Sequence, residues 1–351
     1  MENQNQTPHK RRVRYKGKYP KKFEEKYKEL QPEKYKDTIE HVIQKGNTPA
    51  GMHISIMVKE IIDFLNIQPG EIGFDATLGY GGHTKAMLKC LNGKGHIYAT
   101  DVDPEESDKT KKRLAEQGFG EDLLTVKLQN FCTIDEIAKE VGGFDFILAD
   151  LGVSSMQIDN PKRGFSFKVD GPLDLRLNQE AGISAAERLD TITRDELAGM
   201  LYENSDEPYC EELAKAITDE IRKGNRIDTT TKLRQVIEKT LDFLSEKEKK
   251  DTIKKTCQRT FQALRIDVNR EFEVLYEFME KLPDALRPGG RVAILTFHSG
   301  EDKLVKKALK EGYKAGIYSD YAKDVIRPSA QECAQNGRAR STKMRWAVKN
   351  K

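Results

Sequence analysis

The chain has 351 residues, a formal net charge of only +3 and 37% apolar residues. Its apolar runs are shorter than the roughly eighteen residues of a membrane span, and its first forty residues are polar and charged, so we expect neither a membrane segment nor a signal peptide but a cytoplasmic enzyme. Five widely spaced cysteines without a C-x-x-C pair predict neither a disulfide framework nor a zinc site, and we expect no metal.

The first predicted unit is a basic N-terminal extension, residues 1–50. Residues 10–22 contain eight Lys or Arg and no acid, with Tyr15 and Tyr19 between them. Basic runs with interleaved aromatic residues suit a polyanion with unstacked bases, through phosphate contacts and stacking. The alternative is a solvated tail. Residues 327–351 repeat the bias, with seven basic residues against one acid, Glu332.

A glycine-rich loop follows the first predicted strand. Asp75 ends the strand, and Gly79, Gly81 and Gly82 open a helix. Glycines let the backbone approach a ligand closely, and a helix N-terminus offers unpaired N–H groups. A second strand ends at Asp101, where an acid suits ribose hydroxyl groups. Because the dinucleotide spacing G-x-G-x-x-G is absent, S-adenosylmethionine fits better, with Asp75 near its ammonium group and loop N–H groups at its carboxylate. The alternative is an ordinary tight turn.

Strands and helices alternate up to residue 159, as in an open parallel sheet. We expect strands at residues 72–74, 97–100, 124–128 and 146–149, and helices at residues 54–65, 84–91, 104–117 and 134–141.

From residue 160 to 267 the pattern is helical, and residues 193–196 form a capping box. One long amphipathic helix is expected to run from Phe261 to Met279. Residues 288–290 then turn into a strand at 291–296, and a last strand occupies 343–348. We therefore predict a Rossmann-like α/β domain, residues 51–159 and 268–351, interrupted by a helical domain at residues 160–267.

Polar residues gather where two of these strands end. Residues 150–159, DLGVSSMQID, follow the fourth strand, and residues 296–302, TFHSGED, follow the fifth. Open α/β sheets bind ligands at the carboxyl ends of their strands. A loop so rich in Asp, Ser and Gln is costly to bury unless each group has a partner, so a ligand pocket explains it better than packing does.

Five segments in order resemble the MraW (RsmH) family. They are residues 75–83 (DATLGYGGH), 150–159, 163–167 (RGFSF), 261–271 (FQALRIDVNRE) and 297–302 (FHSGED), and the resemblance runs from about His53 to the end. The family comprises bacterial methyltransferases that act on the N4 amine of a cytidine in the decoding centre of 16S ribosomal RNA. The resemblance implies a class I methyltransferase sheet, S-adenosyl-L-methionine as cofactor and the small ribosomal subunit as partner; it leaves a monomer or a homodimer open.

The resemblance also implies roles for individual residues. S-adenosylmethionine is placed against Gly81, Gly82, His83, Asp101, Phe131, Asp150 and Gln157. Asp150 is expected to accept a hydrogen bond from the target amine, with Ser154 and Ser155 as secondary polar contacts. The helical domain is expected to recognise RNA, and the residues predicted to contact it are Arg163, Phe165, Arg176, Arg265 and His298. Three of these assignments have structural alternatives: a core aromatic for Phe131, an ion pair for Arg265 and a strand-end histidine for His298.

The chain departs from the family pattern in three places. Gly300 stands where the family usually has Leu, residues 54–56 stand where a Pro-Val pair is usual, and the basic stretch before His53 is additional. These departures indicate a divergent branch and leave the exact nucleotide open. A methyltransferase acting on another rRNA nucleotide, on a small molecule or on a protein, and a non-catalytic ribosome-assembly factor, are the alternatives.

Overall fold

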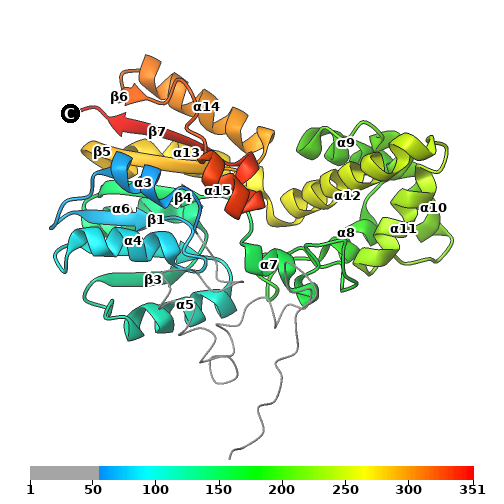
Figure 1. Ribbon diagram of the computed structural model, residues 1–351, viewed down its shortest axis with the longest axis horizontal. Coiled ribbons are helices and arrows are strands. Elements are labelled where there is room, and N and C mark those ends of the chain that lie inside the picture. Colours follow the sequence, from blue (N-terminus) through cyan, green and yellow to red (C-terminus); the bar gives the residue numbers. More distant parts are fainter. Residues whose placement is uncertain (1–54) are drawn as a thin grey trace, which may run out of the picture. The chain divides into compact units, whose positions relative to one another are not determined.

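The computed structural model describes residues 55–351. The basic extension predicted at residues 1–50, His53 and Ile54 lie outside the described residues. Seven strands form one sheet in the order β3-β2-β1-β4-β5-β7-β6 (Figure 1). Their bounds are β1 Ile72–Asp75, β2 His96–Asp101, β3 Leu124–Leu128, β4 Phe144–Asp150, β5 Leu286–Thr296, β6 Tyr318–Tyr321 and β7 Lys343–Lys349.

Strands β1 to β5 are parallel, and β7 runs antiparallel to both β5 and β6. The predicted strands are therefore confirmed, with β6 as an addition. Strand β6 has only four residues, YSDY, and its two central residues are exposed, so it carries no apolar pattern that sequence reasoning could detect. Its partner β7 supplies the pairing that defines it.

The turn expected at residues 288–290 lies within the bounds of β5, which begins at Leu286. Phe144 of β4 pairs with Leu286 and Phe146 pairs with Arg291, so the chain advances five residues in β5 where β4 advances two. Regular pairing is interrupted there, and Gly289 has φ 75°. The irregular stretch accommodates the missing N–H group of Pro288, and regular pairing resumes at Arg291, where the sequence predicted the strand to start.

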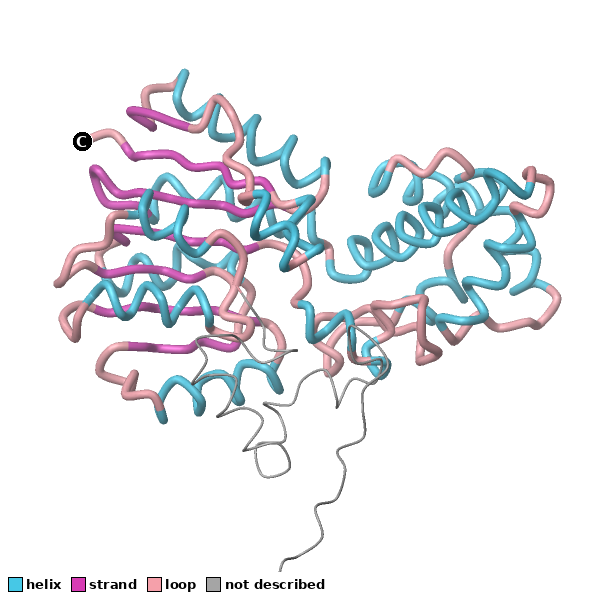
Figure 2. Tube along the Cα trace, in the orientation of Figure 1, coloured by secondary structure: helices cyan, strands magenta, loops and turns pink. Residues whose placement is uncertain are grey.

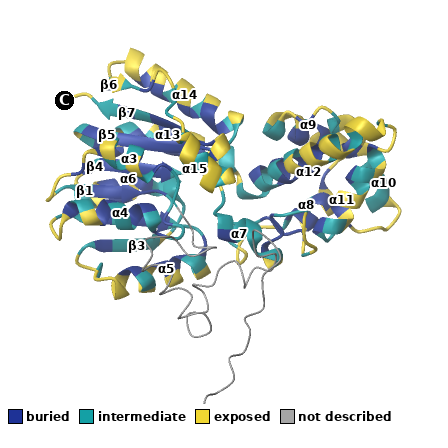
Figure 3. Cartoon of the chain, in the orientation of Figure 1, coloured by how far each residue is buried: buried dark blue, intermediate teal, exposed yellow. Residues whose placement is uncertain are grey.

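Helices cover both faces of the sheet (Figure 2). Helices α3 (Val58–Leu65), α4 (Gly82–Leu91) and α5 (Pro104–Glu116) share one hydrophobic cluster with Phe146 and Leu148 of β4. Helices α6 (Ile134–Val141), α13 (Glu271–Ala285) and α14 (Ser299–Lys314) share another with Ile147 and Ala149. Alternate residues of β4 thus point to opposite faces, and both faces are buried, as in a doubly wound sheet (Figure 3). The predicted α/β fold class is confirmed.

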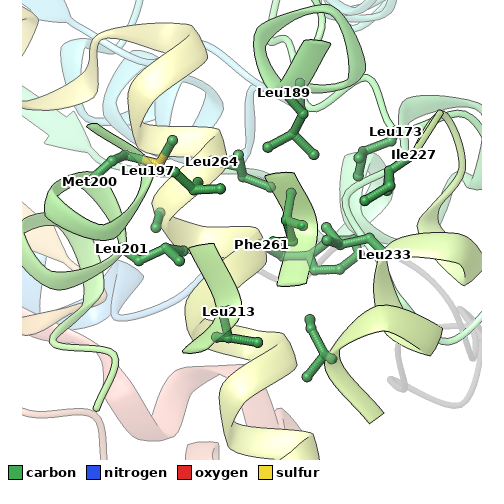
Figure 4. Close-up of a cluster of buried hydrophobic side chains, with 14 of the residues drawn as sticks. Leu173, Leu189, Leu197, Met200, Leu201, Leu213, Ile227, Leu233, Phe261 and Leu264 are labelled. Carbon is green, nitrogen blue, oxygen red and sulfur yellow. The ribbon is translucent and has the colours of Figure 1, made fainter. Parts of the chain in front are cut away.

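Residues 165–264 contribute a third hydrophobic cluster, separate from the two that flank the sheet (Figure 4). It joins helices α8 (Ala185–Thr191), α9 (Arg194–Ser205), α10 (Cys210–Arg222), α11 (Thr230–Thr240) and α12 (Glu246–Asn269). The predicted capping box begins α9: Thr193 Oγ1 accepts from the N–H of Glu196, whose carboxylate accepts from the N–H of Thr193. These helices therefore pack around a hydrophobic core of their own, as expected for an inserted unit at residues 160–267.

The single long helix expected across residues 261–279 is two helices. Arg270 adopts the left-handed conformation, with φ 51°, and separates α12 from α13. Just before it, Asn269 donates to the carbonyl groups of Leu175 and Arg265 and accepts from the N–H of Leu177 at 2.7 Å. Leu175 and Leu177 lie 94 and 92 residues away in sequence, which is why helical periodicity alone did not reveal the break.

Candidate functional site

A cavity of about 360 Å³ opens at the carboxyl ends of β1, β2, β4 and β5. This is where an open α/β sheet changes the direction of its connections and holds ligands, and the volume is within the range typical of small-molecule sites. The cavity brings together most of the predicted residues: Gly79, Gly81, Gly82, His83, Asp101, Phe131, Asp150, Ser154, Ser155, Gln157, Arg265 and His298. Asp75, Arg163, Phe165 and Arg176 do not line it.

The glycine loop shapes one wall of this cavity. Gly81 has φ 73°, and a Cβ atom there would lie 2.7 Å from Cγ2 of Thr110. A Cβ atom at Gly82 would lie 2.0 Å from Oγ of Ser55. Helix α4 begins at Gly82, so the unpaired N–H groups of its first turn border the cavity. Glycine is needed here for close approach as well as for the turn.

Asp101 holds the loop from the end of β2. One carboxylate oxygen accepts from the N–H of Gly79 at 2.8 Å, and the other accepts from the N–H of Asp103 at 2.9 Å. Burial raises the pKa of Asp101 despite these hydrogen bonds. Each carboxylate oxygen has a second lone pair, so Asp101 retains capacity to accept a hydrogen bond from a ligand in the cavity.

Asp75 lies beneath the loop and is 1% exposed. Its carboxylate accepts from Thr84 Oγ1 at 2.6 Å and from the N–H of Thr77 at 3.1 Å. Burial raises its pKa, while these bonds oppose that change. The internal partners favour a structural role for Asp75 over the predicted contact with an ammonium group.

Asp150 ends β4 beside the loop. Its N–H donates to Thr77 Oγ1 at 2.8 Å, and Oδ2 lies 3.4 Å from Nδ1 of His83. The other oxygen, Oδ1, is buried and has no hydrogen-bond partner among residues 55–351. A buried carboxylate oxygen without a partner is costly and points to a donor supplied by a ligand.

His83 is fixed from both sides of its ring. Nε2 lies 2.8 Å from the carbonyl oxygen of Ile56, and Nδ1 faces Asp150. Burial lowers the pKa of His83, but the Asp150 carboxylate, the Ile56 carbonyl and Asp75 together raise it above its ordinary value. The contact between Nδ1 of His83 and Oδ2 of Asp150 thus orients the Asp150 carboxylate.

Asp103, two residues after the end of β2, connects the cavity wall to residues 157–163. Gln157 Nε2 donates to Oδ2 of Asp103 at 3.1 Å, and Arg163 donates to the same oxygen at 2.6 Å. Gln157 also forms the capping box of helix α7 (Ser155–Asp159) with Ser154, so both side chains have internal partners. Ser154 and Gln157 therefore line the cavity and also hold the start of α7 in place.

Three residues predicted to contact RNA are engaged within the protein. Arg163 is 5% exposed and also donates to the carbonyl groups of Arg176 and Leu177. Phe165 is buried in the cluster of the inserted helices, with the Arg163 guanidinium 5.7 Å from its ring centre. Arg176 is paired with Asp174 at 2.8 Å. These contacts favour structural roles for all three.

Another part of the cavity wall carries an ion pair and a histidine–carboxylate contact. Arg265 donates twice to Glu271, at 2.7 and 2.8 Å, and His298 Nε2 lies 3.1 Å from Glu301. The buried Glu301 carboxylate accepts from the N–H of Phe297, and its pKa is lowered: burial raises it, but His298, this N–H and Arg265 outweigh burial. Glu271, His298 and Glu301 could each offer one atom to a metal ion, but Arg265 and the backbone already occupy the carboxylates. We read the group as a charge network of the cavity wall.

A family model described as the MraW methylase family matches residues 50–350. The chain belongs to the MraW methylase family. A relative from Agathobacter rectalis, named Ribosomal RNA small subunit methyltransferase H 1, is 88% identical over 97% of this chain and 98% of its own length. One of the same name from Lachnoclostridium phytofermentans is 70% identical over 99% of this chain and 95% of its own. The predicted family and methyltransferase activity are confirmed, and with them the Rossmann-like methyltransferase fold.

Among solved structures, a SAM-dependent O-methyltransferase from Thermotoga maritima aligns with a TM-score of 0.39 and 11% identity, covering 86% of this chain and 68% of that one. At that score the alignment adds nothing to the strand order described above. Within residues 55–351 of this MraW methylase, no helix combines the length and apolar character of a membrane span.

Sequence reasoning missed several residues of this MraW-family cavity. Gln262, Asn269 and Glu271 line it, although they were quoted only as part of a family motif. Arg338, from the 3-10 helix η4 (Gly337–Ser341), also lines it and pairs with Asp159 at 2.8 Å. The only signal for Arg338 was the basic C-terminal bias.

That C-terminal bias has a largely structural explanation. Lys343 and Arg345 of β7 both pair with Asp302, at 2.8 and 2.6 Å, and Arg345 is 4% exposed. Residues 343–349 are a strand of the sheet rather than a basic tail.

Gly300, where the family usually has Leu, does not line the cavity. A Cβ atom there would lie 2.5 Å from Cζ of Phe272, whose ring fills the space that a leucine would need.

Proposed function

We propose that this MraW methylase transfers a methyl group from S-adenosylmethionine to the N4 amine of a cytidine in 16S ribosomal RNA of the small subunit. The names of its relatives support the RNA substrate. The observation that carries the proposal is the buried, unpartnered Oδ1 of Asp150, which lines the same cavity as the glycine loop. It leaves a buried acceptor available to a donor on a bound molecule.

The cavity residues fit S-adenosylmethionine. Gly81, Gly82 and the first turn of α4 would hold its carboxylate, because N–H groups at a helix start favour an anion. Asp101 would accept from the ribose, and Phe131 would offer an apolar face to adenine. Phe131 lines the cavity and also packs edge-on against Phe278 at 5.2 Å, so its core contact leaves the proposed contact with adenine open. When bound, the cofactor supplies an electrophilic methyl group on sulfur.

The residues around Asp150 supply orientation and hydrogen bonding. The amine of cytosine is a poor nucleophile because its lone pair is delocalised into the ring. Oδ1 of Asp150 would accept a hydrogen bond from one N4–H group of cytosine. This hydrogen bond would favour localisation of the lone pair on N4. His83 holds the Asp150 carboxylate, and the hydrogen bond from the Asp150 N–H to Thr77 Oγ1 holds its backbone. A carboxylate that is already in place lowers the entropy lost when the reactants align. Ser154 and Ser155 stand next to it as further polar contacts.

The target base must leave its stack to reach this cavity. We assign its recognition to the helical unit, residues 160–267, and to the wall formed by Arg265 and His298. Gln262 and Arg265 extend from α12 into the cavity, which ties this unit to the site. This role implies that the protein works in the cytoplasm, where ribosomal subunits are assembled.

Small subunits from a strain lacking this protein test the proposal. Incubation with the purified enzyme and tritium-labelled S-adenosylmethionine should transfer label to the RNA, and mass spectrometry of the rRNA nucleotides should map it to one N4-methylated cytidine. Label at another nucleotide would correct the target. Label in protein or small molecules, with none in RNA, would overturn the proposal, and absence of all transfer would favour an assembly factor.

A further inference from the structure

Helix α14 carries a row of lysines on its exposed face. Lys303, Lys306, Lys307, Lys310 and Lys314 are all exposed, whereas Val305, Leu309 and Gly312 are buried. At about 100° per residue, the five lysines fall within about 100° of one another around the helix axis. They lie opposite the side that packs on β5, β6 and β7, and Figure 3 shows exposed positions along this helix. We call these five residues the lysine stripe.

The stripe is not neutralised within the described residues 55–351, where none of the five lysines forms an ion pair. The lysines of α5 behave differently: Lys109, Lys111 and Lys112 pair with Glu105, Glu121 and Asp108. Like charges three and four residues apart destabilise a helix. An uncompensated row on one helix therefore favours an anionic partner over a merely solvated face.

The stripe begins at the end of α14 that borders the cavity. His298 and Glu301 line the cavity, and Lys303 follows Glu301 by two residues, on the opposite, exposed side of the same helix. From Lys303 to Lys314 the helix advances about 16 Å, with about 5.4 Å between turns. Its only exposed acid, Glu311, flanks the stripe. The row thus starts close to the site and covers a length that several successive phosphates can follow.

We propose that the lysine stripe binds the phosphodiester backbone of the RNA that flanks the target nucleotide. This inference rests on the proposed function. Ammonium groups on long, flexible stems bind phosphates without reading sequence, which suits a surface that positions a strand. An anionic membrane is a poorer partner, because a helix that lies on lipid needs a free apolar face and α14 buries its own against the sheet.

Replacing all five lysines with glutamine tests the stripe. The matched control replaces five exposed lysines that pair with acids, Lys59, Lys109, Lys111, Lys112 and Lys139, and changes the net charge equally. The probes are isolated small subunits and a decoding-centre hairpin of 16S rRNA. We expect the stripe variant to bind both probes at least ~10-fold more weakly and to reduce the slope of log K against log salt by about two to four.

The control variant should keep the wild-type salt slope to within about one. Replacing the stripe with arginine should preserve RNA binding, and S-adenosylmethionine affinity should not change in any variant. The melting temperature of the glutamine stripe variant should not fall, because the substitution removes repulsion between like charges. Equal RNA affinity and salt slope for the stripe and control variants would overturn the inference. So would loss of binding to phosphatidylglycerol vesicles with RNA binding intact.

The two proposals fail in different ways. If the wild-type protein methylates RNA and the stripe variant binds and methylates it equally well, only the stripe is refuted. If the wild-type protein binds RNA through the stripe but transfers no methyl group to it, the stripe stands and the proposed function falls.

Discussion

Arg163 and Asp103 form an ion pair of 2.6 Å in which the two residues are only 5% and 2% exposed. It joins the segment after α7 to the residue that precedes α5, next to Asp101, which lines the cavity. Removal of Arg163 would leave the buried Asp103 carboxylate with neutral donors and no positive charge, and would take one donor from the carbonyl groups of Arg176 and Leu177. We expect Arg163→Ala to lower the free energy of unfolding by about 3 to 5 kcal/mol.

Urea denaturation measures this loss, and Arg234→Ala is the control. Arg234 pairs with Glu238 on the surface of α11, so its removal should cost only about 0.3 to 0.5 kcal/mol. A loss for Arg163→Ala as small as that of the control would refute the structural role. Weaker RNA binding by the folded variant, without loss of stability, would restore the predicted RNA contact.

His83 should make stability depend on pH. Because its pKa is raised in the folded protein, its contribution is fully present below the unfolded pKa of about 6.5 and is lost as the pH rises through the folded value. The difference in unfolding free energy between wild type and His83→Gln should therefore shrink as the pH rises. NMR titration of the His83 ring protons checks the pKa directly. In the Asp150→Asn variant the pKa of His83 should fall, because burial disfavours the protonated ring and the Asp150 charge no longer compensates. An unchanged pKa would contradict the pairing of His83 with Asp150.

Asp150→Asn should also slow methyl transfer. The amide has a similar shape but is a weaker acceptor, so we expect the rate to fall about 10²- to 10⁴-fold. Single-turnover transfer at saturating cofactor and RNA measures this step, and calorimetry measures cofactor binding separately. Near-normal turnover would remove Asp150 from the proposed role, whereas a loss confined to cofactor affinity would make it a binding residue only.

Gly300 and Phe272 should be energetically coupled. A leucine at position 300 would clash with the Phe272 ring, so Gly300→Leu should destabilise the protein by about 1 to 3 kcal/mol. Combining it with Phe272→Ala, which frees space, should recover part of this loss, with a coupling energy of about 0.5 to 3 kcal/mol in a double-mutant cycle. Additive effects would show that Phe272 does not explain the departure from the family's usual leucine.

Deletion of residues 1–45 tests the basic extension predicted from sequence. If residues 10–22 bind RNA, the truncated protein should bind small subunits more weakly. The slope of log K against log salt should then fall by about one for each lost phosphate contact. Cofactor affinity should not change, because Gly81, Gly82 and Asp101 are retained. Unchanged RNA binding together with a lower melting temperature would favour packing of residues 23–42 on the rest of the protein.

The elements that could be predicted from sequence are those defined by neighbours in the chain. The strand before Asp75, the loop from Gly79 to Gly82 and the capping box at Thr193 depend on contacts within a few residues, so periodicity and composition reveal them. The convergence of Asp101 and Asp150 followed from a general property of parallel sheets, whose strands end at a common edge. For these residues sequence alone was sufficient.

Tertiary structure decided the features whose partners are distant in sequence. Arg163 looks like a free basic residue in a loop, yet Asp103, sixty positions earlier, buries it. Lys343 and Arg345 extend a basic run, yet both pair with Asp302. A charge contributes to a surface only when folding leaves it solvated and unpaired, and that depends on which acids the fold brings within a few ångströms. Local sequence contains no record of those distances.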